Sequence, residues 1–170
     1  GGLGAHYGAE KLGCVVVPAS GGGTERQVSL IQDFGPAILC STPSYALNIA
    51  EVAESMGVDM AALPVVRGLF GAEPWSNEMR AELDRRLGVL SVDVYGLSEI
   101  MGPGVACECD AARDGLHGWE DHFIFEVIDP ETLEPRFALS VAKPGRTNRN
   151  SPKKAPASVS VAFAVRESSR

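Results

Sequence analysis

The chain has 170 residues, of which 45% are apolar, so it is long enough for a globular domain with a buried core. Its net charge of −7 is uneven: residues 1–135 hold 7 Lys/Arg against 21 Asp/Glu (net −14), and residues 136–170 hold 8 against 1 (net +7). The sequence lacks an apolar run of the roughly 20 residues that span a bilayer, a signal-peptide pattern and a cysteine framework for disulfides. We therefore expect a cytoplasmic protein without a membrane partner, and the missing initiator Met predicts that the chain starts inside a longer protein.

Four helices are predicted, each with a start, a stop or an apolar face. The first covers residues 4–12 and ends at Gly13. Thr24 is placed to cap the second helix, with Gln27 at capping-box spacing. Ser44 caps the third, which runs to about Met56, and Gly88 ends the fourth. The inward faces are predicted to be Val28, Ile31 and Phe34 on the second helix, Ala46, Ile49, Ala50 and Ala53 on the third, and Trp75, Met79, Leu83 and Leu87 on the fourth.

Short apolar runs between the helices predict strands. They lie at residues 14–18 (CVVVP), 37–41 (AILCS), 65–71 (VVRGLFG) and 90–96 (LSVDVYG), with a further strand and turn at residues 123–132 (FIFEVIDPET). The first four start every 23 to 28 residues with one helix in each gap, which is the spacing of βαβ units. The predicted fold class is α/β, with a parallel βαβ-type sheet and flanking helices.

The pattern fails after about Glu134. Residues 135–170 are rich in Pro, Ser, Lys and Arg, and their one apolar run, at 159–165, has no partner signal nearby. We predict a folded part over residues 1–134 and a divergent basic tail over residues 135–170 that is disordered. A shifted reading frame would explain this tail, and the genomic sequence just downstream of the codon for Glu134 would test that interpretation.

Ligands bind parallel sheets at the C-terminal ends of the strands, and here those ends carry SGGGTE, STPS, GAEP and YGLSE. In YGLSE, Tyr95 can stack on a flat ring, and Gly96 lets the backbone approach a ligand. Ser98 can bond a phosphate oxygen, and Glu99 is a hard oxygen ligand suited to Mg²⁺. A polar turn with Glu99 in solvent fits the spacing equally well.

GAEP, residues 71–74, ends the preceding strand, so its backbone groups could bond the edge of a purine beside YGLSE. Taken alone, it is better explained as a helix-entry turn, because Pro74 suits a first helical turn. SGGGTE lacks the lysine of a phosphate loop and is better explained as a flexible strand-to-helix turn.

The cysteines and histidines favour neither a metal site nor a nucleophile. Cys107 and Cys109, with His117 and His122 nearby, do not have the spacing of zinc ligands. His6 is better placed on a helix surface or pocket wall than in catalysis, and no Ser–His–Asp or Cys–His set can be assembled.

Residues 1–134 nevertheless resemble one known family, on the segments SGGGTERQVSLIQDFGPAIL, TPSYALNIAE, LFGAEPW, DVYGLSEIMGPGVACEC and GLHGWEDHFIFEVIDPET. They closely resemble phenylacetate–coenzyme A ligases, which are adenylate-forming acyl-CoA synthetases. The resemblance implies a partial AMP-binding (adenylation) domain, the incomplete N-terminal domain of such an enzyme. It also implies that ATP activates phenylacetate or a related aryl acid to an acyl-adenylate, releasing pyrophosphate, and that coenzyme A then displaces AMP. Full-length family members serve phenylacetate catabolism and are commonly homodimers.

The resemblance implies roles residue by residue. Tyr95 stacks on adenine, beside Gly71, Ala72, Glu73, Pro74, Asp93 and Gly96. Ser98, where many members of the superfamily have threonine, contacts the phosphates, and Glu99 helps to hold Mg²⁺; these two are the implied catalytic residues. The aryl-acid pocket is bordered by Tyr7, Tyr45, Ile100, Gly102 and Pro103.

Three parts of the family pattern are not found in this sequence. The Ser/Thr/Gly-rich phosphate loop is expected upstream of Gly1, the Arg-and-Asp ribose motif is expected where the tail stands, and the small C-terminal domain with its adenylation lysine is missing. We therefore expect a central piece of a ligase that is inactive alone. A non-catalytic nucleotide-binding or interaction remnant is the alternative. A tail that binds nucleic acid is disfavoured, because its charges are scattered and its aromatics are only Phe137 and Phe163.

Overall fold

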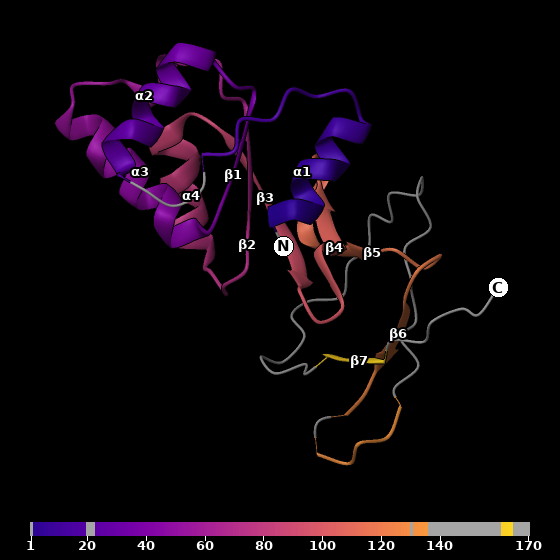
Figure 1. The fold of residues 1–170 in the computed structure, drawn as a ribbon. Helices are drawn as coiled ribbons and strands as arrows, with labels where there is room; N and C mark the ends of the chain where they lie inside the picture. Colours follow the sequence, from indigo (N-terminus) through magenta and orange to yellow (C-terminus); the bar gives the residue numbers. More distant parts are fainter. Residues whose placement is uncertain (1, 20–22, 130, 136–160, 165–170) are drawn as a thin grey trace. The chain divides into compact units, whose positions relative to one another are not determined.

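A five-stranded sheet organises the first of two units in the computed structural model, which describes residues 2–19, 23–129, 131–135 and 161–164 (Figure 1). The units are Gly1–Gly118 and Trp119–Arg170, and each is described by itself. The helices of the first unit are α1 (Gly2–Lys11), α2 (Thr24–Phe34), α3 (Pro43–Ser55), the short 3-10 helix η1 (Met60–Ala62) and α4 (Asn77–Leu87). Its strands are β1 (Ile38–Ser41), β2 (Arg67–Gly71), β3 (Leu90–Leu97), β4 (Met101–Cys109) and β5 (Ala112–Gly118).

The strand order in the sheet is β1-β2-β3-β4-β5. β1 pairs with β2, and β2 with β3, in parallel, as the βαβ spacing predicts. The sheet then continues through two antiparallel pairs, β3 with β4 and β4 with β5, which the sequence analysis did not predict. The start of β4 was not predicted because the glycine and proline residues at 102–104 interrupt the apolar alternation by which a strand is recognised.

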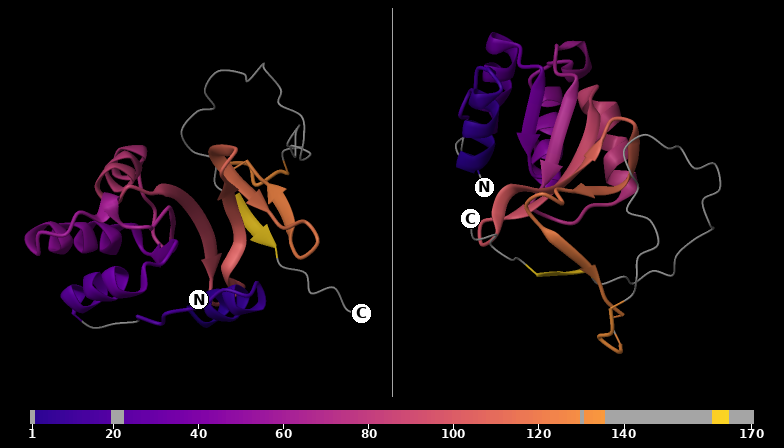
Figure 2. Two further views of the ribbon diagram at one scale, coloured as in Figure 1. Left: turned by 90° about the horizontal axis from the view of Figure 1, so that it is seen from above. Right: turned by 90° about the vertical axis from the view of Figure 1, so that its right-hand side faces the viewer.

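The core lies between the helices and one face of the sheet. α2, α3 and α4 form one layer, whereas α1 lies apart from them beside β4, as Figures 1 and 2 show. All four predicted inward residues of α3 are buried, as are Leu83 and Leu87 of α4, and they pack around the fully buried Phe70 of β2. Phe34, predicted to face inward, is instead 63% exposed, because α2 ends there at Gly35 before its last turn reaches the core.

The caps of two helices differ from the prediction by one or two residues. Thr42, not Ser44, caps α3 by accepting a hydrogen bond from the backbone N–H of Tyr45 at 3.4 Å. Gly23 stands at the cap position of α2, where no side chain caps the helix. Thr24 is therefore the first helical residue rather than the cap, and its hydroxyl is used in a long-range contact described below. α4 begins at a Ser76 cap and ends at Gly88 in the left-handed conformation, as predicted for Gly88.

The strand predicted at residues 14–18 is wrong. These residues follow α1 as an irregular segment, and Val15 is 93% exposed. A strand needs a neighbour to receive its backbone hydrogen bonds, and β1 pairs only with β2 among the described strands. Apolar, β-branched composition alone therefore does not make this segment a strand.

The second unit contains the predicted strand within residues 123–132. β6 (Ile124–Val127) is followed by a turn in which the carboxylate of Asp129 accepts hydrogen bonds from the backbone N–H groups of Glu131 and Thr132. β6 pairs in antiparallel fashion with β7 (Val161–Ala164). The rest of the predicted disordered tail, residues 136–160 and 165–170, lies outside the described residues. In the part of the chain that the structure describes, no helix is long and apolar enough to cross a membrane.

The core makes a testable prediction about two leucines. Leu83 is fully buried, so Leu83→Ala should lower the free energy of unfolding by about 2–5 kcal/mol through lost burial and a cavity. Leu12 is largely exposed, and the same change there should cost less than about 0.5 kcal/mol. Urea unfolding followed by circular dichroism measures both, and equal destabilisation would contradict the observed core.

Candidate functional site

The C-terminal ends of β1, β2 and β3 lie at one edge of the sheet, because these neighbouring strands are parallel. STPS (residues 41–44), GAEP (residues 71–74) and YGLSE (residues 95–99) therefore come together from three distant parts of the sequence. The start of α2 reaches the start of α3, where the hydroxyls of Thr24 and Tyr45 are hydrogen-bonded at 3.2 Å.

One carboxylate joins two of these segments. Oε1 of Glu73 accepts a hydrogen bond of 2.6 Å from the backbone N–H of Ser44, in the first turn of α3. The N-terminus of a helix carries unsatisfied N–H groups and a partial positive charge, so a carboxylate there is stabilised. Glu73 thus fixes the GAEP turn against α3. The sequence analysis predicted only that the backbone of this turn contacts a purine, and it did not predict this side-chain contact.

The GAEP turn approaches β3 too closely for a side chain at its first position. Gly71 lies in register with Val94, and a Cβ atom on Gly71 would overlap the carbonyl oxygen of Val94. The next residue, Ala72, has a φ of 70°, which is the left-handed region that residues other than glycine seldom adopt. Pro74 follows Glu73 directly and precedes α4. A strained backbone of this kind is typical of functional sites.

The remaining predicted nucleotide residues lie along β3 and the turn after it. Asp93 stands opposite Phe70 of β2, and Tyr95 opposite Ala106 of β4. A Cβ on Gly96 would come within 2.8 Å of the backbone N of Gly104 and O of Met101, so this position needs glycine. The list is completed by Ser98 and Glu99, which are both exposed in the turn between β3 and β4.

The predicted aryl-acid residues fall into two places. Tyr7 is on α1, which packs against β4, where Gly102 and Pro103 lie, and a Cβ on Gly4 would overlap the carbonyl oxygen of Gly102. Ile100 precedes β4 in the turn. Tyr45 is on α3, where its ring is half-buried and its hydroxyl is engaged with Thr24.

A buried ion pair next to these segments was not found from the sequence. The Arg80 guanidinium of α4 makes two hydrogen bonds with the carboxylate of Glu108 in β4, at 2.6 and 3.0 Å. Arg80 falls on the apolar stripe of the predicted helix, three residues before Leu83. A cation on the apolar face of a predicted helix could have indicated this ion pair, because a buried charge needs a partner of opposite charge.

Metal-ligating side chains do not form a cluster in the described part of the chain. None of its His, Cys, Asp and Glu side chains form a group of three or more that could hold a metal ion. Burial, followed by the neighbouring Cys109 and Glu108, raises the pKa of the Cys107 thiol, which therefore favours the protonated form at neutral pH. A single exposed carboxylate at Glu99 fits a Mg²⁺ ion that takes most of its ligands from phosphate oxygens and water.

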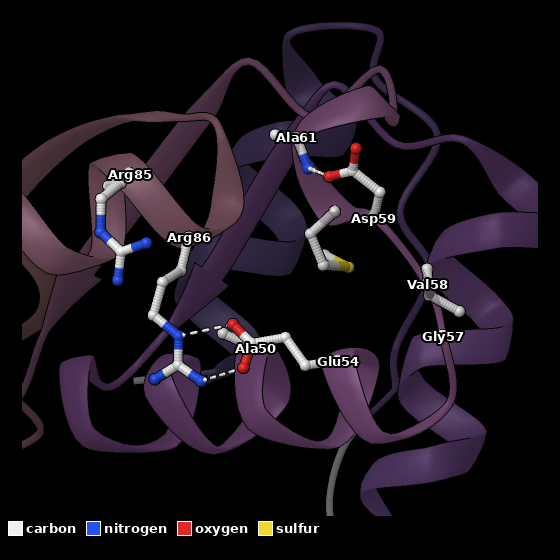
Figure 3. A pocket seen from close by; sticks show the side chains of 9 residues that line it. Ala50, Glu54, Gly57, Val58, Asp59, Ala61, Arg85 and Arg86 are labelled. Atoms are coloured by element: carbon white, nitrogen blue, oxygen red, sulfur yellow. Dashed lines mark hydrogen bonds and ion pairs between the residues drawn. The ribbon is translucent and has the colours of Figure 1, made fainter.

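A hollow of about 430 Å³ lies at the other edge of the sheet, where α3 and α4 end and the strands begin (Figure 3). Three of its four charged side chains, those of Glu54, Asp59 and Arg86, already have partners. Arg86 makes two hydrogen bonds to Glu54 at 2.9 and 3.0 Å, and Asp59 accepts from the backbone N–H of Ala61. This hollow is therefore a weaker candidate for ligand binding than the edge formed by the strand ends.

Comparison with known proteins shows what the chain is similar to. No family model matches the chain. Curated phenylacetate–coenzyme A ligases do match, with 59% identity over 134 residues in Pseudomonas putida, 54% over 136 residues in Escherichia coli and 56% over 135 residues in Thermus thermophilus. Each match covers 79% of this chain and about 30% of the relative. Over the matched residues, the chain is closely similar to phenylacetate–coenzyme A ligases, of whose length it spans about 30%.

Solved structures agree with this placement. A 2-hydroxyisobutyryl-CoA ligase, in complex with its acyl-AMP and CoA, matches with a TM-score of 0.71 and 26% identity, covering 75% of this chain and 31% of that one. An acyl-CoA synthetase of Brucella canis matches with a TM-score of 0.54 and 20% identity over 69% of this chain and 22% of that one, which supports the fold alone. The predicted α/β fold of an adenylate-forming enzyme, present in part, is thus confirmed.

The close approach at Gly71 makes a second testable prediction. Gly71→Ala should destabilise the fold by about 1–3 kcal/mol, because its Cβ meets the β3 backbone, which must shift. Gly8→Ala is the matched control, since Gly8 lies in α1 with open space around it and alanine favours a helix. Urea unfolding should show the first variant less stable than wild type and the second equal or more stable. A neutral Gly71→Ala would contradict the backbone contact.

Proposed function

We propose that this chain supplies the nucleotide- and acid-binding segment of a phenylacetate–coenzyme A ligase. The reaction activates phenylacetate with ATP to an acyl-adenylate, releasing pyrophosphate, and transfers the acyl group to coenzyme A, releasing AMP. The observation that carries this proposal is the 54–60% identity to four curated ligases, on a segment whose strand ends meet at one edge. The chain spans about 30% of the length of these relatives, so the whole protein's activity is inferred from them.

The nucleotide would lie across the ends of β2 and β3. Tyr95 would stack on adenine, and the backbone of the GAEP turn and of Asp93 would border the edge of the base. The close backbone approaches at Gly71 and Gly96 support this assignment, because they fix the two segments that would border the base.

The phosphates would lie over the turn between β3 and β4. Ser98 would donate to a phosphate oxygen, and Glu99 would share the ligation of Mg²⁺ with the phosphates. The ion supplies charge neutralisation at the α-phosphate when it is bound. Both side chains are exposed in that turn, where a phosphate could reach them, and this supports these roles.

The aryl acid would lie near α1 and the start of β4. Tyr7, Ile100, Gly102 and Pro103 would border its ring from one side and Tyr45 from α3. This chain's contribution to the reaction is then positional: it would hold the carboxylate of the acid near the α-phosphate, and such alignment lowers a reaction barrier without any covalent step by the protein. We place the whole protein in the cytoplasm, in phenylacetate catabolism and as a homodimer, by analogy with the family.

A chimeric enzyme tests the proposed function. Residues 1–134 would replace the matching segment of the Pseudomonas putida relative, which is 59% identical over 134 residues. The chimera should form AMP from ATP only when phenylacetate and coenzyme A are present, as chromatography would show. A folded chimera that binds ATP without turnover would instead favour the alternative, a non-catalytic nucleotide-binding remnant.

Glu99 can be tested in the same chimera. Glu99→Gln should lower the adenylation rate at limiting Mg²⁺ by at least about tenfold, because a Lewis acid contributes several kcal/mol, with little change in thermal stability. Glu51→Gln, another exposed glutamate, on α3, is the control and should leave the rate unchanged. If the rate of Glu99→Gln equals wild type when Mg²⁺ is limiting, Glu99 does not belong to the metal site.

A further inference from the structure

We propose that Arg80 and Glu108 are positioning residues for the nucleotide base. They touch neither the reacting atoms nor the base, but they hold the two backbone segments between which the base would lie. The inference rests on the proposed function for the location of the base and goes beyond it by adding two residues to the site.

The pair is buried and completely formed. The side chain of Arg80 is 15% exposed and that of Glu108 is 4% exposed, and two charge-assisted hydrogen bonds join them at 2.6 and 3.0 Å. They come from different layers, Arg80 from α4 and Glu108 from β4. The pair therefore connects the helix layer to the antiparallel half of the sheet.

Glu108 fixes β3 at the proposed base site. The oxygen of Glu108 that accepts from Arg80 at 2.6 Å also accepts from the backbone N–H of Asp93 at 2.8 Å. Arg80 donates in addition to the carbonyl oxygen of Ser91, at 3.2 Å. Two backbone groups of β3, both within four residues of Tyr95, are thus bound to this one ion pair.

Arg80 also fixes the GAEP turn. Its guanidinium lies over the indole ring of Trp75, 4.6 Å from the ring centroid, in a cation–π contact. Trp75 directly follows Pro74, and its ring packs edge to face on Phe70, just before Gly71, at 6.0 Å and 88°. The Trp75 ring, which contacts Arg80, therefore links the residue after the GAEP turn to the residue before it.

A buried ion pair is a poor choice if stability is the only need. Its desolvation cost nearly cancels its attraction, and an apolar pair of similar size is often as stable. What an apolar pair cannot do is accept the N–H of Asp93 or donate to Ser91. The particular value of this pair is that it sets the distance and direction between the GAEP turn and β3.

The same helix offers a control pair. Arg86 of α4 makes a similar two-bond pair with Glu54 of α3, at 2.9 and 3.0 Å; the Arg86 side chain is 9% exposed, whereas that of Glu54 is 61% exposed. It lies by the hollow at the opposite edge of the sheet. The double variants R80M/E108M and R86M/E54M each exchange one such pair for two methionines.

The test measures AMP binding to the full 170-residue chain by calorimetry, together with urea unfolding. R80M/E108M should bind AMP at least about tenfold more weakly, because the GAEP turn and β3 lose the pair that holds them together, and it should also be less stable, because the N–H of Asp93 loses its acceptor. R86M/E54M should bind like wild type. Amide exchange should become faster at Asp93 in R80M/E108M only. E108Q retains one acceptor oxygen, so its AMP affinity should fall between those of wild type and the double variant. It replaces the double variant in the test if the double variant does not fold.

Each result decides the proposal. AMP affinity unchanged in folded R80M/E108M, or in E108Q if the double variant does not fold, would overturn the positioning role and leave the proposed function intact. Equal losses of affinity in both double variants would reduce the pair to a general structural role and also overturn the inference. If the wild-type chain does not bind AMP, the proposed nucleotide site fails, and the positioning role fails with it.

Discussion

The parallel pairing of β1, β2 and β3 is the constraint on which the site depends. Strands that run in one direction need a return connection along the face of the sheet, and α3 and α4 supply it. Their apolar stripes then meet Phe70 in one core, and the turns that leave the strands emerge at one edge. The same pairing thus builds the core and gathers GAEP and YGLSE, which lie about 20 residues apart in the chain.

The site edge and the core are held by different kinds of contact. The core depends on apolar burial, which sets no precise direction and tolerates small shifts. At the edge, Glu73 binds the N–H of Ser44, Thr24 binds Tyr45, and the backbone at Gly71 approaches Val94 without room for a side chain. Such directional contacts and close approaches fix geometry to fractions of an ångström, which is what a site for a flat base and phosphates requires.

The elements that could be predicted from the sequence are those with a regular spacing of apolar residues. The inward stripe of α3 and the strands at 38–41, 67–71 and 90–97 were predictable, because one regular element decides each pattern. β4 was not, since its first half is Gly- and Pro-rich and its pairing depends on β3. The failed strand at 14–18 has strand composition but no partner among the described strands, and partners are a property of the fold rather than of a segment. The motifs at the strand ends could be located from the sequence, but not the side chains that hold them, such as Glu108, whose role depends on a tertiary contact.

α4 combines these two kinds of contact along its length. Its apolar residues Leu83 and Leu87 bury into the core, while Arg80 and Arg86 lie six residues apart, or about 9 Å along the axis. Arg86 joins α4 to the neighbouring helix, which concerns only the helix layer. Arg80 joins it to β4, and through Glu108 to β3, so one ion pair contacts the helix and both strands. The two arginines therefore connect different parts of the fold although each makes a two-bond pair: Arg86 joins two helices, whereas Arg80 joins a helix to the sheet.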